Sequence, residues 1–247
     1  MKIIVLGAAG RMGRVLIEQI HKSSAYELAA AVDCSRAEGT ISELPLYTGE
    51  ADCIIDFSHH SATALMLDYA VFRQIPLVIA TTGQTDQEKR MIENAAKSTP
   101  IFFSSNMSLA VALLAELAAR AVSLFPEADI EIIERHHNRK QDVPSGTALM
   151  LGEAICGVRP GSKLVVGRHE NGRRSPNDIG IHSLRLGNEV GTHEIIIATD
   201  TQTITLAHHA QDRSLFAEGA LKAADFVVGK CNGLYGMQDL LSQGGKE

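Results

Sequence analysis

The sequence predicts an α/β protein in which a doubly wound parallel sheet is joined to a second, α+β domain with a mixed, largely antiparallel sheet. Strand-like apolar runs alternate with helical stretches up to about residue 103. After residue 160, four runs rich in β-branched residues follow one another, separated by Gly, Asn and Asp. Alternating strands and helices are typical of a parallel sheet, whereas short strands joined by turn residues are typical of an antiparallel one.

The first part of the chain shows a strand, a glycine turn and a helix in succession. Lys2–Leu6 has the pattern of a buried strand, and an amphipathic helical pattern runs from Arg14 to about Lys22. The alternation continues, with strands expected at 27–32, 53–57, 77–80 and 101–103 and helices at 60–73 and 86–97. This order predicts parallel strands with helices on both faces of the sheet.

The second part begins with a long helix and continues with short strands. We expect helices at 109–125 and 148–156 and strands at 129–134, 163–166, 181–186, 194–198 and 202–207. A last helix is expected at 215–228, and its apolar face would return to cover the first sheet.

The glycine turn after the first strand has the spacing Gly7-x-x-Gly10-x-x-Gly13. Glycines let a backbone turn tightly, approach a pyrophosphate and pack a helix against a strand, which is the Rossmann-like arrangement. Such a turn can also serve packing alone, but Asp33 follows the next strand, twenty residues after Gly13, where a carboxylate can bind the adenine ribose. Asp33 favours NADH, whereas the nearby Arg36 could meet the 2′-phosphate of NADPH, so both cofactors stay open.

Polar residues follow directly after three further strands, at 56–58, 81–83 and 104–106. Each group could be an ordinary turn. Because the carboxyl ends of parallel strands share one edge of the sheet, their common position favours a role near the nicotinamide half of a cofactor.

The segment from Glu134 to Ala148 combines several kinds of site chemistry. His136 and His137 can exchange protons near neutral pH, and Lys140 adds a compact positive charge. Ser-Gly-Thr at 145–147 precedes an apolar run, so a helix N-terminus there could bind a carboxylate or phosphate. The two histidines and the nearby basic residues could form a solvated loop, and Ser-Gly-Thr could be an ordinary helix cap. The combination of the two features favours an active site.

Composition excludes several classes of partner. The net charge is −6, so nothing favours binding to nucleic acid or an anionic membrane. No run of about 18 apolar residues occurs, so no membrane span is expected. The first apolar run ends too soon at Gly7 for a signal peptide, and a cytoplasmic protein is expected.

The four cysteines are far apart and contain no Cys-x-x-Cys pair, which argues against zinc, iron–sulfur clusters and disulfides. Six of the ten histidines occur as three adjacent pairs, His59-His60, His136-His137 and His208-His209, and neighbours in extended chain point to opposite faces. We therefore expect no metal site.

With these residues in view, the chain resembles the 4-hydroxy-tetrahydrodipicolinate (dihydrodipicolinate) reductase family nearly from end to end. Glu134 to Ala148 is the most specific part of the resemblance, since many dehydrogenases share the glycine turn. The other matching segments are 7–13, 81–83, 106–108, 179–185, 190–193, 213–221 and 233–239.

The resemblance implies hydride transfer from NADH or NADPH to a cyclic imine dicarboxylate, giving tetrahydrodipicolinate in the diaminopimelate and lysine pathway. It implies that His136 and Lys140 are catalytic and act in proton donation. It places the substrate against His137, Ser145, Gly146 and Thr147. The implied cofactor-binding residues are Gly7, Ala8, Ala9, Gly10, Arg11, Met12, Asp33, Ala80, Thr81, Thr82, Ser104, Ser105, Asn106 and Met107.

The change of sequence pattern after Asn106 predicts two domains. We expect a dinucleotide-binding domain at 1–106, completed by 216–247, and a substrate-binding and oligomerisation domain at 107–215. A sheet of apolar strands needs its second face covered, and the family's tetrameric habit predicts a homotetramer.

Two other functions are compatible with parts of the sequence. One is a different NAD(P)-dependent reductase of a small oxo or imino acid, which would not need residues 145–147 to bind a carboxylate. The other is a non-catalytic dinucleotide sensor, which could dispense with His136 and Lys140 but would carry a recognition module, and no basic recognition helix is present.

Overall fold

The computed structural model describes residues 1–243, which form two compact units. The first unit combines Met1–Leu109 with the chain from Arg213 onward, and the second is Ala110–Asp212. The last four residues of the expected segment 216–247 lie outside the described residues.

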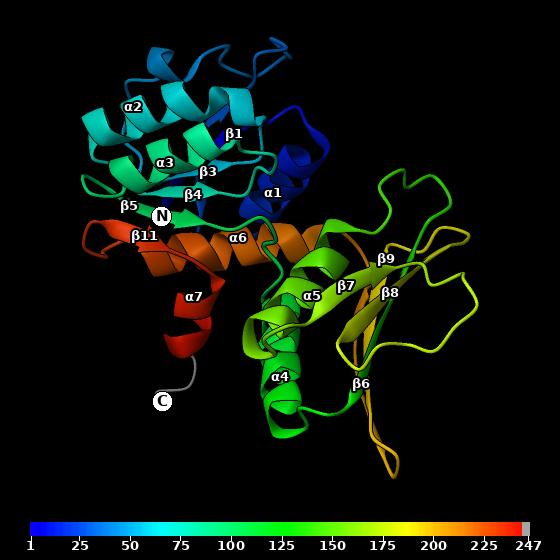
Figure 1. Cartoon of the computed structure of the whole chain (residues 1–247). Coiled ribbons are helices and arrows are strands. Elements are labelled where there is room, and N and C mark those ends of the chain that lie inside the picture. Colours follow the sequence, from blue (N-terminus) through cyan, green and yellow to red (C-terminus); the bar gives the residue numbers. More distant parts are fainter. Residues whose placement is uncertain (244–247) are drawn as a thin grey trace. The chain divides into compact units, whose positions relative to one another are not determined.

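The first unit contains a six-stranded sheet in the order β11-β5-β4-β3-β1-β2 (Figure 1). Every neighbouring pair is parallel, as the alternation of strands and helices predicts. The strands are β1 (Lys2–Leu6), β2 (Glu27–Val32), β3 (Cys53–Asp56), β4 (Leu77–Ile79), β5 (Pro100–Phe103) and β11 (Gly233–Tyr235).

Helices cover both faces of this sheet, with α2 (Thr63–Arg73) and α3 (Asp86–Ala95) on one face and α1 (Arg11–Lys22) and α6 (Ser214–Val227) on the other (Figure 1). The short helices are η1 (Leu44–Leu46), η2 (His60–Ala62) and α7 (Met237–Gln243). Successive side chains of a strand point to opposite faces, so both helical layers receive apolar contacts. The expected Rossmann-like doubly wound sheet is therefore confirmed.

The second unit contains a five-stranded sheet in the order β10-β9-β6-β8-β7, with two helices. Its elements are α4 (Leu109–Leu124), β6 (Asp129–His136), α5 (Gly146–Val158), β7 (Lys163–Val166), β8 (Asp178–Arg185), β9 (Gly191–Ala198) and β10 (Thr203–Ala210). The expected mixed sheet is confirmed, with antiparallel pairing in half of its neighbouring strand pairs. Two neighbouring pairs are antiparallel and two are parallel, because the chain returns through α5 before β7 and again crosses over before β8.

The core of the second unit lies between one face of this sheet and helices α4 and α5. Ile130 and Ile132 of β6 belong to that core and are fully buried. Because strand residues two apart share a face, Glu134 and His136 continue the same row. The inner face of β6 therefore changes from apolar to ionisable at the end of the strand.

No helix among residues 1–243 is long and apolar enough to cross a membrane.

Candidate active site

The turn between β1 and α1 brings bare backbone to the carboxyl edge of the first sheet. Gly7 has a φ of 75°, a conformation that side chains disfavour, and a Cβ there would lie 2.5 Å from the carbonyl oxygen of Phe57. The Gly10 amide donates to the Gly7 carbonyl at 3.0 Å, and α1 begins at Arg11. The positive end of the helix dipole therefore faces this turn, where an anion can be bound.

Asp33 lies directly after β2 and reaches back to the glycine turn. Its Oδ2 accepts a hydrogen bond from the Ala9 amide at 2.9 Å, and its Oδ1 accepts one from the Ser35 amide at 2.9 Å. Burial by itself raises the pKa of Asp33, but these hydrogen bonds outweigh burial and hold the pKa below its ordinary value. The side chain is therefore a charged acceptor at the turn.

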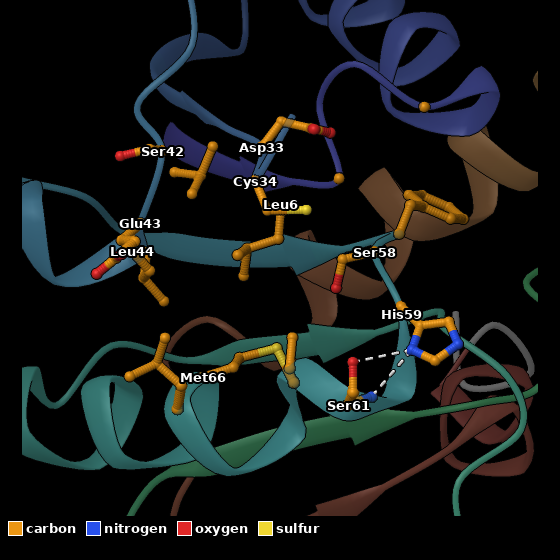
Figure 2. A pocket seen from close by; sticks show the side chains of 16 residues that line it. Leu6, Asp33, Cys34, Ser42, Glu43, Leu44, Ser58, His59, Ser61 and Met66 are labelled. Carbon is orange, nitrogen blue, oxygen red and sulfur yellow. Dashed lines mark hydrogen bonds between the residues drawn. The ribbon is translucent and has the colours of Figure 1, made fainter. Parts of the chain in front are cut away.

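A cavity of about 630 Å³ lies beside Asp33 and the glycine turn (Figure 2). Leu6, Leu44 and Met66 give it apolar walls, and His59 lies at its rim. The His59 Nδ1 accepts from the Ser61 amide at 3.3 Å, which fixes the ring at the start of η2. An apolar cavity next to a carboxylate can hold a flat ring with an attached diol, such as adenosine.

Only some of the residues expected near the nicotinamide line a second cavity. Ser104 and Ser105 line a cavity of about 550 Å³ together with Gly83, Gln84, Lys89 and Phe103. Ala80 is half-buried and Thr82 exposed, whereas Thr81 and Met107 are buried. The Ser104 hydroxyl donates to the Asn106 carbonyl at 2.7 Å, so the backbone after β5 is held in a turn.

In the second unit, His136 is the last residue of β6 and is paired with the buried Glu134. The His136 Nδ1 lies 2.6 Å from Oε2 of Glu134, whose side chain has no exposed surface. Arg185 of β8 donates to both carboxylate oxygens, at 2.7 and 2.8 Å, and the Ser145 amide donates at 3.1 Å. Burial raises the pKa of Glu134, but the hydrogen bonds from His136 and Arg185 outweigh burial, so the pKa lies well below its ordinary value.

Lys140 lies in the turn that follows β6. Its amide donates to the His137 carbonyl at 3.1 Å, and its ammonium group lies 2.8 Å from Oδ2 of Asp142. The Arg185 side chain also donates to the Asp142 carbonyl at 2.8 Å. These contacts fold the turn back toward the end of β6 and fix the position of the Lys140 ammonium group within the loop that follows His137.

Ser145 begins α5 and joins the helix to a second histidine. Its Oγ accepts from the Ala148 amide at 3.2 Å and lies 3.0 Å from Nε2 of His193. At the start of the helix, Gly146 is exposed and Thr147 half-buried. The structure thus brings the expected residues of the second unit to one end of its sheet, with a helix N-terminus among them.

His193 of β9 is buried and packs edge-on against the His136 ring, with 5.3 Å between ring centroids. Burial, followed by repulsion from His136, lowers the pKa of His193 to about 4. It is therefore neutral near neutral pH, and it contributes shape and a hydrogen bond rather than charge.

Three residues of this cluster received no role from the sequence: Glu134, Arg185 and His193. Glu134 could have been found, because an acidic residue occupies an inner-face position in the row formed by Ile130, Ile132 and His136. Arg185 and His193 come from other strands, and only the sheet register places them beside Glu134 and His136.

No cluster of three or more His, Cys, Asp or Glu side chains suited to holding a metal ion occurs in the part of the chain that the structure describes. The ionisable residues of the second unit are instead paired with one another. The chemistry they offer is proton transfer and anion binding.

Two family models match consecutive parts of the chain. "Dihydrodipicolinate reductase, N-terminus" matches residues 1–107, and "Dihydrodipicolinate reductase, C-terminus" matches residues 110–241. The chain belongs to the dihydrodipicolinate reductase family. The N-terminal, dinucleotide-binding model covers the first segment of the first unit, whereas the segment of that unit from Arg213 falls within the C-terminal model. The resemblance seen in the sequence is confirmed.

Relatives in the family match over their whole length. A 4-hydroxy-tetrahydrodipicolinate reductase of Caldanaerobacter subterraneus subsp. tengcongensis is 43% identical over 249 residues, 99% of each chain. One from Alkaliphilus metalliredigens is 40% identical, over 98% of this chain and 99% of that protein. A solved dihydrodipicolinate reductase from Paenisporosarcina sp. TG-14, with dipicolinate bound, has a TM-score of 0.79 and 25% identity, covering 97% of this chain and 98% of the other.

Proposed function

We infer that the protein is a 4-hydroxy-tetrahydrodipicolinate reductase, an NAD(P)H-dependent oxidoreductase of the diaminopimelate and lysine pathway. The observation that carries this conclusion is the full-length match to reductases of that name at 43% and 40% identity. The buried cluster around His136 agrees with it, because it offers the proton chemistry that reduction of an imine requires. The sensor alternative has no use for such a cluster.

The cofactor would be held by the first unit. Gly7 to Met12 would bind the pyrophosphate, Asp33 the ribose hydroxyls, and the cavity lined by Leu44 and Met66 the adenine. Ala80, Thr81, Thr82 and residues 104–107 would lie along the nicotinamide half. When bound, the reduced nicotinamide supplies a hydride. The charged Asp33 favours NADH, because a 2′-phosphate would meet its negative charge.

The substrate is proposed to be a small cyclic imine with two carboxylates. His137, Ser145, Gly146 and Thr147 would bind one carboxylate, since amides at the start of α5 and the nearby Lys140 favour an anion. Hydride addition to a conjugated imine leaves electron density on the ring that must be protonated. His136 and Lys140 are the proposed donors of that proton.

Turnover with each cofactor tests the proposal. We expect oxidation of NADH, and more slowly of NADPH, when the ring substrate is generated enzymatically from its precursors. His136→Ala combined with Lys140→Ala should abolish turnover while nucleotide binding, followed by nicotinamide fluorescence, stays at the wild-type level. Wild-type turnover in the double variant would overturn the assignment of the two residues. Absence of turnover in the wild-type protein with either cofactor would overturn the function.

A homotetramer is part of the proposal, assembled through the face of the second sheet opposite α4 and α5. Ile133, Leu184 and Ile196 contribute apolar surface there. Among them lie the ion pair of Arg135 with Glu194 at 2.7 Å and the contact of His182 Nε2 with Glu131 at 2.8 Å. An apolar face carrying already paired charges is suited to burial against further copies of the chain.

A further inference from the structure

Glu134 is a fully buried, charged residue to which the proposed proton transfer assigns no role. Burying a carboxylate is costly unless its oxygens are well supplied with donors. Here four contacts surround it: His136 Nδ1 at 2.6 Å, the two Arg185 nitrogens at 2.7 and 2.8 Å, and the Ser145 amide at 3.1 Å. Three different elements, β6, β8 and the start of α5, therefore fix its position.

These contacts determine which nitrogen of His136 carries a proton. A charged carboxylate can only accept hydrogen bonds, so the nitrogen 2.6 Å from Glu134 must be the donor. The Nδ1 position is therefore protonated, and Nε2 is left to exchange protons. Nε2 lies beside the backbone of Gly191, where a Cβ would be 3.1 Å away. Because glycine has no Cβ, no side chain of this residue crowds Nε2.

We propose that Glu134, held in place by Arg185, is a positioning residue that keeps a proton on Nδ1 of His136, so that the proton His136 donates is the one bound at Nε2. The proposal rests on the assignment of His136 as a proton donor. In the step, the Nε2–H bond breaks and its proton bonds to the ring carbon that holds the electron pair left by hydride addition. The electron pair of the broken N–H bond stays on Nε2. The Nδ1–H group remains hydrogen-bonded to Glu134, and water restores the lost proton.

The other ionisable groups around His136 are neutral or paired, Arg185 with Glu134 itself. His193 on β9 is neutral near neutral pH, and Lys140 is paired with Asp142. The ionisable groups that face His136 or its direct neighbours are Glu134, Arg185, His193, Lys140, Asp142 and His208. Glu134 is the one whose negative charge contacts the ring directly, so its removal should act on proton donation.

Glu134→Gln tests the proposal because it keeps the shape and removes the charge. We expect kcat/KM to fall about ten- to a hundredfold, as is usual when the partner of a reacting group is removed. The pH dependence of kcat/KM should also change, because a glutamine amide can donate as well as accept and no longer fixes the proton on Nδ1. Glu134→Asp, which retains the charge, should restore most of the pH profile. NADH affinity should be unchanged in both variants.

Glu131→Gln is the matched control, because Glu131 lies on the same strand and pairs with His182 on the opposite face of the sheet. Its pH profile should match that of the wild type. A wild-type profile in Glu134→Gln as well would overturn the proposal.

The tautomer can be read without turnover, from the side-chain ¹⁵N signals of His136 in the wild-type protein. Nδ1–H in the neutral ring is expected, and Nε2–H would overturn the proposal even where Glu134→Gln fails to fold. If instead His136→Ala retained turnover while the wild-type ring showed Nδ1–H, the assigned role of His136 would fail and the tautomer would stand.

Discussion

At the level of single residues, burial has opposite consequences for the two ionisable neighbours of His136. His193 has lost its charge, because burial and repulsion from His136 outweigh the attraction of Glu134, and its pKa falls to about 4. Glu134 has kept its charge, because Arg185 and His136 supply hydrogen bonds that outweigh burial. A neutral ring and a charged carboxylate thus flank the same histidine.

The depressed pKa of His193 predicts acid sensitivity of the fold. Between about pH 6.5 and about pH 4 the unfolded chain binds a proton at His193 that the folded chain does not. The free energy of unfolding should therefore fall as pH falls through this window, by at most about 1.4 kcal/mol per unit from this residue. Below the ordinary pKa of 4.5, Glu134 adds to the loss. Urea unfolding measured at several pH values follows the effect.

His193→Gln should give a flatter dependence of stability on pH in the same window, since glutamine does not titrate. His208, whose pKa burial also lowers, is present in both proteins and cancels from the comparison. An unchanged slope in His193→Gln would show that other groups govern the acid sensitivity.

At the level of elements, two helix-capping residues allow effects on stability to be distinguished from effects on activity. Ser145 caps α5 and Thr85 caps α3, each by accepting an amide hydrogen bond three residues on. Ser145→Ala and Thr85→Ala should each cost about 1 kcal/mol of stability, measured by thermal unfolding. Only Ser145→Ala should also raise KM for the ring substrate, because Ser145 lies beside His193 and the proposed carboxylate site. Equal KM values in the two variants would remove Ser145 from substrate binding.

The element order was largely predictable because periodicity reports burial directly. β1, β2 and β7 match their expected bounds. The helices α1 and α5 begin earlier than expected, at Arg11 and Gly146, because polar and glycine residues of a first turn carry no apolar signal. The short β11 and α7 were missed, since three or seven residues show too little of a period to identify.

The candidate site was predictable only where its residues are adjacent in sequence. His136, Lys140 and Ser145 lie within one segment, and their chemistry is visible in its order. The partnership of Glu134 with Arg185 depends on β8 lying parallel to β6 with His136 opposite Arg185. The sequence predicted a largely antiparallel sheet, and strand register is not readable from a single sequence.

At the level of the whole molecule, the uncovered face of the second sheet predicts the assembly. Leu184 lies on that face and is 43% exposed, whereas Leu117 on α4 is 47% exposed on another surface of the same unit. Leu184→Asp should shift the tetramer toward smaller species in light scattering, because assembly would bury a charge. Leu117→Asp should leave the mass unchanged. Identical masses for both variants and the wild type would place the interface elsewhere.

The first sheet is completed late during synthesis of the chain. β11 pairs with β5, so that Gly233 lies opposite Pro100, and the second unit is inserted between these strands. Phe102 of β5 also packs against Phe226 of α6, with 5.9 Å between ring centroids. On the ribosome, the second unit emerges whole while the nascent first unit still lacks α6 and its edge strand. A chain stalled before Arg213 would thus present the Phe102 face of the sheet to chaperones, and the nucleotide fold is completed only after its insert.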